Sequence, residues 1–80
     1  MHLREEARYT LEIRNDADAA LALALENWRV QKEPLDARIA LEAALAAHKP
    51  AAAREVVAWV ASSGLEGERL RALASKASQR

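Results

Sequence analysis

The sequence predicts an all-α fold, in which about five helices form antiparallel hairpins within one domain. Its 80 residues include 20 Ala and 11 Leu, but only 4 Val, 2 Ile and no Phe. Ala and Leu favour helices, whereas strands favour β-branched and aromatic residues. Two Gly and two Pro are too few to punctuate a sheet of several strands. The expected loops are very short, so successive helices should pack side by side and antiparallel.

The first two helices are expected over residues 3–14 and 17–31. Asn15 and Asp16 separate them, because this pair suits a turn followed by a new helix N-cap. The second helix is nearly all apolar from residue 17 to residue 25, which indicates that it is buried on most sides.

The remaining helices are expected over residues 34–47, from Pro50 to about residue 61, and over residues 66–78. Pro34 and Pro50 suit the first turn of a helix, where the missing N–H has no intrahelical partner. Gly64 stands where a left-handed C-cap would end the fourth helix, with Leu65 as the apolar contact that often accompanies such a cap.

Similar residues recur at a spacing of 33 or 34 positions, which indicates an internal repeat. The pairs and triplets that follow this spacing are Ala7, Ala40 and Ala74; Ala19 and Ala52; Leu23 and Val56; and Ile39 and Leu73. Trp28 and Trp59 lie 31 apart and do not follow it. Small residues at such places allow two helices of a pair to approach closely.

This pattern resembles the tetratricopeptide repeat (TPR). In the central repeat, the motif places hold Asp36, Ile39, Ala40, Ala43, Ala52, Val56 and Gly64. The last helix fits the first-helix pattern with Leu70, Leu73, Ala74 and Ala77, and the first repeat fits with Leu3, Ala7, Ala19 and Leu23. The chain departs from the motif at Asp36 and Ala43, where large or aromatic residues are usual, at Gly64 in place of Pro, and at Glu6 in place of Leu.

The resemblance implies a short right-handed superhelix with repeats over residues 1–32 and 33–64 and a capping helix over residues 65–80. It also implies a non-catalytic scaffold or adaptor that binds a protein or peptide. Two repeats are fewer than a solenoid usually needs. We therefore expect a C-terminal piece of a larger, bacterial-type repeat protein, which packs on preceding repeats or forms a homodimer. The alternative function is a structural end cap or oligomerisation module of a longer protein.

Two surfaces are candidate contact sites. Arg38, Glu42 and Leu45 share one face of the third expected helix at i, i+4 and i, i+7 spacing. In TPR-like stacks this helix lines the groove that binds peptides, although a solvated Arg–Glu pair is the simpler interpretation. Tyr9 and Ile13 are one turn apart on the first helix and are expected to form an exposed apolar seam for self-association or inter-repeat packing.

The aromatic and histidine side chains are interpreted structurally. Trp28 and Trp59 stand among apolar neighbours, so packing is favoured over partner contact. His48 lies at the end of a helix, where a residue able to carry positive charge suits the dipole, and no nucleophile or orienting carboxylate stands near it in sequence.

Composition argues against several other classes of function. The 12 basic and 12 acidic residues are interspersed, so we expect no nucleic-acid partner. The longest apolar run covers residues 19–25, well short of the roughly 20 residues that span a bilayer, and no signal peptide is recognisable. Without Cys and with two distant His, no metal site or cofactor is expected, and the localisation stays open.

Overall fold

The computed structural model describes residues 2–64 and 67–78, and this part of the chain is helical and contains no strand. The helices are α1 (Leu3–Glu12), α2 (Ala17–Val30), α3 (Pro34–Ala46), the 3₁₀ turn η1 (Pro50–Ala53), α4 (Arg54–Ser63) and α5 (Glu68–Ser78). The predicted all-α class with five helices is confirmed.

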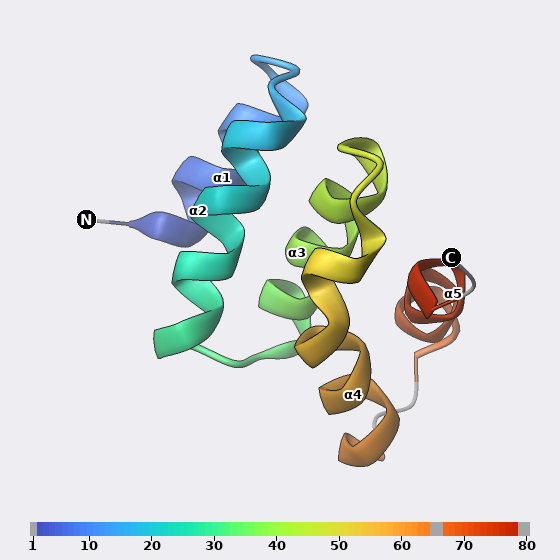
Figure 1. Cartoon of the computed structure of the whole chain (residues 1–80). Helices are drawn as coiled ribbons and strands as arrows, with labels where there is room; N and C mark the ends of the chain where they lie inside the picture. The colour runs from blue at the N-terminus through green and yellow to red at the C-terminus, as the bar shows by residue number, and fades with distance from the viewer. Residues whose placement is uncertain (1, 65–66, 79–80) are drawn as a thin grey trace.

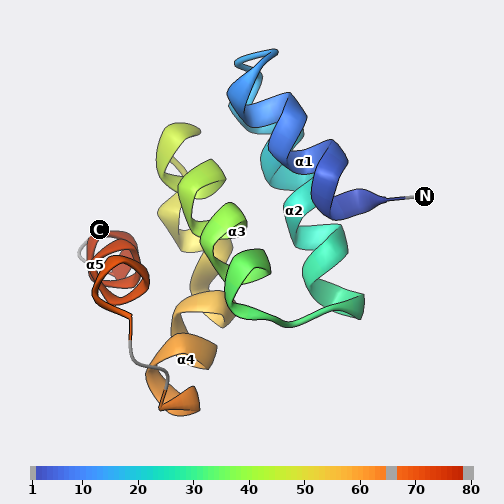
Figure 2. The same cartoon turned by 180° about the vertical axis from the view of Figure 1, so that it is seen from behind.

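The helices form two antiparallel hairpins with a fifth helix beside the second one (Figure 1). Helices α1 and α2 make the first hairpin and α3 and α4 the second, and α3 is central because it contacts all four other helices. Helix α5 packs on α3 and α4. It is seen almost end-on in both Figure 1 and Figure 2, so it crosses the second hairpin instead of running alongside it.

The helix boundaries follow the predicted caps with two differences: α1 ends at Glu12 and not at residue 14, and the fourth helix begins with a different turn. The carboxylate of Asp16 accepts a hydrogen bond from the Ala19 N–H at 3.1 Å and caps α2, and Gly64 ends α4 in the left-handed region with φ of 72°. The fourth helix does not begin as an α-helix at Pro50. Residues 50–53 form a 3₁₀ turn first, because the Ala52 N–H bonds to the carbonyl of Lys49, three residues back. The predicted start of the fifth helix and the Leu65 cap contact lie outside the described residues.

Of the alanines that the repeat pattern aligns, Ala7, Ala40 and Ala74 are buried, whereas Ala19 is half-buried and Ala52 is exposed, so the second predicted line of small packing residues is wrong. Alanines nevertheless form most of the core. Those that are almost completely buried are Ala7, Ala20, Ala24, Ala37, Ala40, Ala43, Ala44 and Ala53. Larger apolar side chains fill the space between them, chiefly Leu41, Ile39, Val56, Val60 and Trp28. The small side chains let α1, α2 and α3 approach one another closely, so α3 is enclosed on most of its circumference.

The two tryptophans join the hairpins, which confirms their predicted packing role. Trp28 on α2 is only 3% exposed and meets the half-buried Trp59 of α4 edge to face, with ring centroids 5.1 Å apart. Lys32 closes the end of α2: its ammonium donates to the Trp28 carbonyl at 2.7 Å and lies 5.4 Å from the Trp28 ring centroid. Aromatic pairs of this geometry stabilise beyond the area that they bury.

A buried carboxylate, that of Asp36 on α3, joins the first three helices. Arg4 of α1 binds it with two hydrogen bonds, Nε to Oδ1 at 2.7 Å and Nη2 to Oδ2 at 2.8 Å. Asn27 of α2 donates from Nδ2 to Oδ1 at 2.7 Å, and the Glu33 N–H donates to Oδ2 at 3.2 Å. Arg4 also reaches the Glu33 carboxylate at 2.8 Å. We call Arg4, Asn27, Glu33 and Asp36 the Asp36 cluster.

The Asp36 cluster keeps its carboxylate ionised although the residue is only 1% exposed. Burial by itself raises the pKa of Asp36, but the hydrogen bonds from Arg4 and Asn27 outweigh it, and the pKa lies below the ordinary value for Asp. The same hydrogen bonds, to Asp36 first and Glu33 second, raise the pKa of the Arg4 guanidinium. The cluster is therefore a paired, fully hydrogen-bonded charge at the junction of three helices.

We predict that Asp36→Asn lowers the free energy of unfolding by about 3 kcal/mol, because it removes the buried partner of the Arg4 guanidinium and leaves that charge only the exposed carboxylate of Glu33. Chemical denaturation followed by circular dichroism measures the change. The matched control is Asp18→Asn, which removes an exposed ion pair with Lys49 (2.9 Å) and should cost less than about 0.5 kcal/mol. Equal losses in the two variants would contradict this account of the cluster.

The stabilisation by Asp36 should disappear in acid. A group whose pKa is lowered by folding stabilises the protein above its unfolded pKa of about 3.9, and this contribution is lost as the pH falls through the folded pKa. The stability difference between the wild type and Asp36→Asn should therefore be constant near neutral pH and shrink below about pH 4. A difference that stays constant or grows in acid would show that ionised Asp36 is not the stabilising form.

Candidate functional site

The face predicted on the third helix is occupied by an internal ion pair. Arg38 Nε lies 3.1 Å from Glu42 Oε2, one turn along α3, and both side chains are half-buried. Leu45 is also half-buried and packs against the core. The structure thus brings Arg38 and Glu42 together, but each satisfies the other. That these three residues bind a partner stays a prediction.

The seam predicted on the first helix is open to solvent. Tyr9 is 56% exposed and Ile13 is 63% exposed, which makes them, with Val30, the large apolar side chains most open to solvent in the described part of the chain. Glu5 and Glu6 stand on the same outward side of α1, since the buried side carries Ala7 and Thr10. This outward face combines apolar and acidic side chains.

His48 has a structural place at the end of α3. It adopts a positive φ of 60°, and its N–H bonds to the Leu45 carbonyl at 3.1 Å. The Lys49 N–H bonds to the Ala44 carbonyl at 2.8 Å, so the two residues close the helix in the pattern of a Schellman motif. Its position supports the interpretation of His48 as a helix-end residue.

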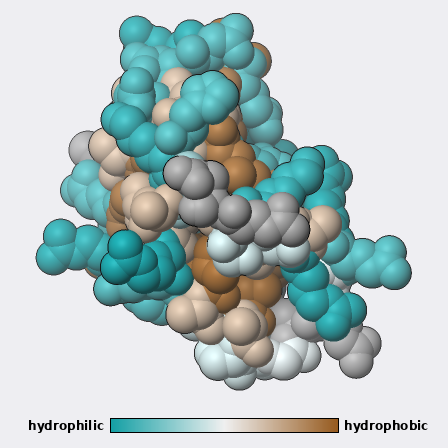
Figure 3. All heavy atoms as spheres, turned by 45° about the vertical axis from the view of Figure 1, so that its right-hand side comes forward, coloured by the Kyte–Doolittle hydropathy of each residue, from teal (hydrophilic) through white to brown (hydrophobic). Residues whose placement is uncertain are grey.

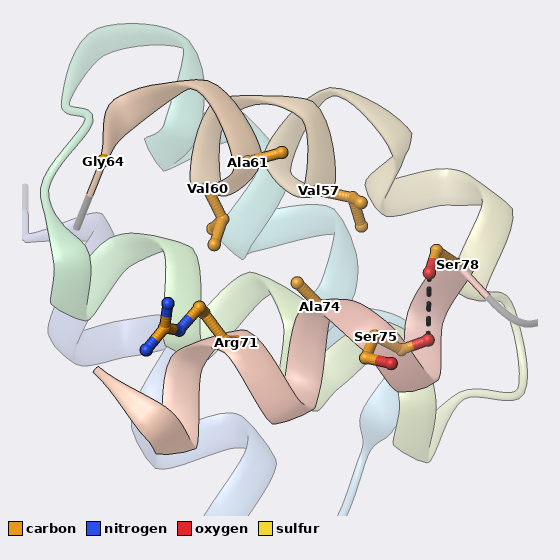
Figure 4. Close-up of a pocket in the computed structure, with 8 residues that line it drawn as sticks. All are labelled: Val57, Val60, Ala61, Gly64, Arg71, Ala74, Ser75 and Ser78. Carbon is orange, nitrogen blue, oxygen red and sulfur yellow. Dashed lines mark hydrogen bonds between the residues drawn. The ribbon is translucent and has the colours of Figure 1, made fainter. Parts of the chain in front are cut away.

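A groove between α4 and α5 forms a hollow of about 460 Å³ on the surface (Figure 4). Its lining residues are Val57, Val60, Ala61, Gly64, Arg71, Ala74, Ser75 and Ser78. Figure 4 shows the valines and Ala61 of α4 facing Ala74 and Arg71 of α5 across the hollow. The Ser78 hydroxyl donates to the Ser75 carbonyl at 2.9 Å, so this hydroxyl serves its own helix.

The groove continues past Val57 and Ser78 into a second hollow of about 260 Å³, which Pro50, Ala51, Arg54 and Ala77 complete. Arg71 and Gly64 stand at one end of the groove and Val57 and Ser78 at the other in Figure 4, so Arg54 belongs to the end remote from Arg71. Figure 3, which turns this side of the molecule forward, shows hydrophobic atoms along the middle of the face between hydrophilic margins. We call the two hollows together the α4–α5 groove.

The α4–α5 groove has positive charge at both ends. Arg71 and Arg54 line it, and within the described part of the chain neither forms an ion pair and no acidic side chain lines either hollow. An apolar floor with an available guanidinium at each end suits a ligand that carries apolar side chains and carboxylates.

Sequence reasoning missed this groove, although part of its signal was present. Val57 and Ala61 are one turn apart on α4, and Arg71, Ala74, Ser75 and Ser78 follow i, i+3, i+4 and i+7 spacing on α5. These spacings place each set on one helix face. That the two faces meet depends on how α5 crosses α4, which the helix pattern does not determine.

Two other features are absent from the described residues. Among them no group of three or more His, Asp or Glu residues is arranged to hold a metal ion, and none of the described helices is long and apolar enough to cross a membrane. Comparisons of the chain with protein-family models, with curated proteins and with solved structures found no match.

Gly64 ends α4 and also lines the groove. We expect its substitution to lower stability because its backbone has a left-handed conformation. An Ala Cβ would meet no atom within 4 Å, but φ is +72°, so we predict that Gly64→Ala lowers the free energy of unfolding by about 1 kcal/mol. Gly67→Ala is the control, because its φ is not left-handed and its added Cβ would lie 3.8 Å from Leu70 Cβ. A smaller loss at Gly64 than at Gly67, measured by thermal denaturation, would contradict the prediction.

Proposed function

We propose that this chain is a non-catalytic interaction module of TPR-like type, and that it binds a protein segment in the α4–α5 groove. The observation that carries the proposal is the combination of an apolar groove floor with two arginines that have no described ion-pair partner. A segment with apolar side chains on one side and carboxylates at its margins would satisfy both features.

The order of the helices supports the TPR-like part of the proposal. Two successive antiparallel hairpins are followed by a further helix, and the aligned small residues Ala7 and Ala40 are completely buried. The crossing of α5 over the second hairpin and the replacement of a large residue by the charged Asp36 depart from an ideal repeat. These departures leave the interaction role in place, because the groove needs only α4 and α5.

Two alternatives remain as proposals. The α3 face of Arg38, Glu42 and Leu45 is less favoured, because its arginine is already paired and its leucine packs on the core. A purely structural role as end cap or oligomerisation module of a longer repeat protein is the other alternative, and the exposed Tyr9 and Ile13 favour it.

The groove should bind a synthetic helical peptide that carries two Leu one turn apart and Glu on either side of them. Fluorescence anisotropy measures its affinity for the wild type, for Arg71→Glu and for Arg69→Glu. Reversal of Arg71 should weaken binding at least about tenfold, because the groove then repels the peptide, whereas Arg69, exposed on the same helix and outside the groove lining, should tolerate the same change.

Two further binding measurements distinguish the α4–α5 groove from the α3 face. The same peptide with Lys in place of Glu should bind more weakly than the Glu peptide. Arg38→Glu should leave affinity unchanged if the groove is the site. A tenfold loss in Arg38→Glu with none in Arg71→Glu would move the site to α3, and no binding by any variant would refute the peptide-binding proposal.

A further inference from the structure

We infer that this protein associates with further copies of itself head to tail, with the outward face of α1 of one copy seated in the α4–α5 groove of the next. The inference rests on the proposed binding role of the groove and names its occupant. It follows from two surfaces of the same molecule that complement each other in both hydropathy and charge.

The α1 face supplies the apolar and acidic side. Tyr9 and Ile13 are one helical turn apart and both more than half exposed, so they project as an adjacent apolar pair. Glu5 and Glu6 flank this pair on the same outward side and form no described ion pair. The nearby Arg8 is already engaged by Glu12, with Nε to Oε2 at 3.6 Å, so its charge is partly offset.

The groove supplies the apolar and basic side. Val57, Val60 and Ala74 form its floor, and Arg71 and Arg54 belong to its two ends. The hollow of about 460 Å³ is open, so an apolar side chain can enter without displacing a helix. Seating Tyr9 and Ile13 there would remove exposed apolar surface from both copies. It would also bring Glu5 and Glu6 toward Arg54 and Arg71, none of which forms an ion pair in the described part of the chain.

The two surfaces lie on different sides of the molecule. Helix α1 packs on α2 and α3, whereas the groove lies between α4 and α5 on the far side of the second hairpin (Figure 1). Such a contact is heterologous, so each added copy leaves one α1 face and one groove free. Association should therefore produce open chains of copies, or rings where the rotation between copies closes, and not an isologous dimer.

A mixing experiment tests the pairing directly. The head variant, Tyr9→Arg with Ile13→Arg, loses the α1 face and keeps the groove. The groove variant, Arg71→Glu with Ala61→Glu, loses the groove and keeps the α1 face. All four positions are exposed, so both variants should fold, which far-ultraviolet circular dichroism and thermal denaturation verify.

Sedimentation velocity should show that the wild type grows in mass with concentration and that each variant alone is monomeric. An equimolar mixture of the two variants should form a complex of two chains, because one intact groove meets one intact α1 face. High salt should weaken both the wild-type chains and the mixed complex at least several-fold. The control variants, Val30→Arg for the head and Arg69→Glu with Ala72→Glu for the groove, should associate as the wild type does.

Other outcomes overturn the inference in distinguishable ways. A groove variant that still dimerises alone would show that α1 faces pair with each other symmetrically. A mixture that stays monomeric, or a wild type that is monomeric at every concentration, would exclude the head-to-tail contact. If that wild type still binds the Glu-bearing synthetic peptide, only the self-association fails. If it binds no peptide either, the proposed groove function fails as well.

Discussion

Burial of the Asp36 carboxylate constrains the arrangement of the first three helices. An ionised carboxylate in an apolar interior is costly unless donors surround it, and here the donors come from α1, α2 and the start of α3. Arg4 and Asn27 can reach the same carboxylate only when their helices take one relative position. The alanines make this position attainable, since larger side chains would hold the helices apart. Charge pairing and close packing therefore specify the same junction.

The second half of the molecule is held mainly by apolar contacts. Trp59 of α4 packs against Trp28 of α2, and Val56, Val60 and Leu70 place α4 and α5 in the common hydrophobic core. Within the described residues, no ion pair joins α4 to α5. Helix α5 crosses α4 and leaves the groove between them. Binding at this edge would therefore leave the Asp36 cluster undisturbed.

The distribution of paired and unpaired charges also separates the three-helix junction from the two surfaces that we propose for binding. The charges at the three-helix junction and on α3 neutralise one another within the chain, as the pairs Arg4–Asp36 and Arg38–Glu42 show. Among the charged side chains that form no described ion pair, Glu5 and Glu6 lie on the outward side of α1, and Arg54 and Arg71 line the groove. Because the whole chain has a net charge of zero, its composition does not reveal that these unpaired charges are acidic on the α1 face and basic in the groove. Electrostatic steering between copies is consistent with it.

Much of the fold was predictable from the sequence because helix signals are local. The Asp16 cap, the Gly64 termination and the burial of Ala7, Ala40 and Ala74 follow from residue type and spacing and are confirmed, whereas the aligned Ala52 is exposed. The Asp36 cluster could not be predicted, because Arg4 and Asp36 are 32 residues apart and the repeat pattern marks Asp36 only as a departure. The groove could not be predicted either, since its two helix faces meet through the crossing of α5. Tyr9 and Ile13 were identifiable because exposure on an amphipathic helix follows from its period.

We propose that the protein binds through the α1 face and the α4–α5 groove. A dilution series of ¹⁵N–¹H correlation spectra of the uniformly labelled wild-type protein tests it most directly, since it reports on every amide of the intact chain. The account predicts that concentration shifts the signals of α1 near Tyr9 and Ile13 and those of the groove near Ala61 and Arg71 together, with one apparent affinity. Shifts confined to the α3 face around Arg38 and Glu42, or spectra independent of concentration, would contradict it.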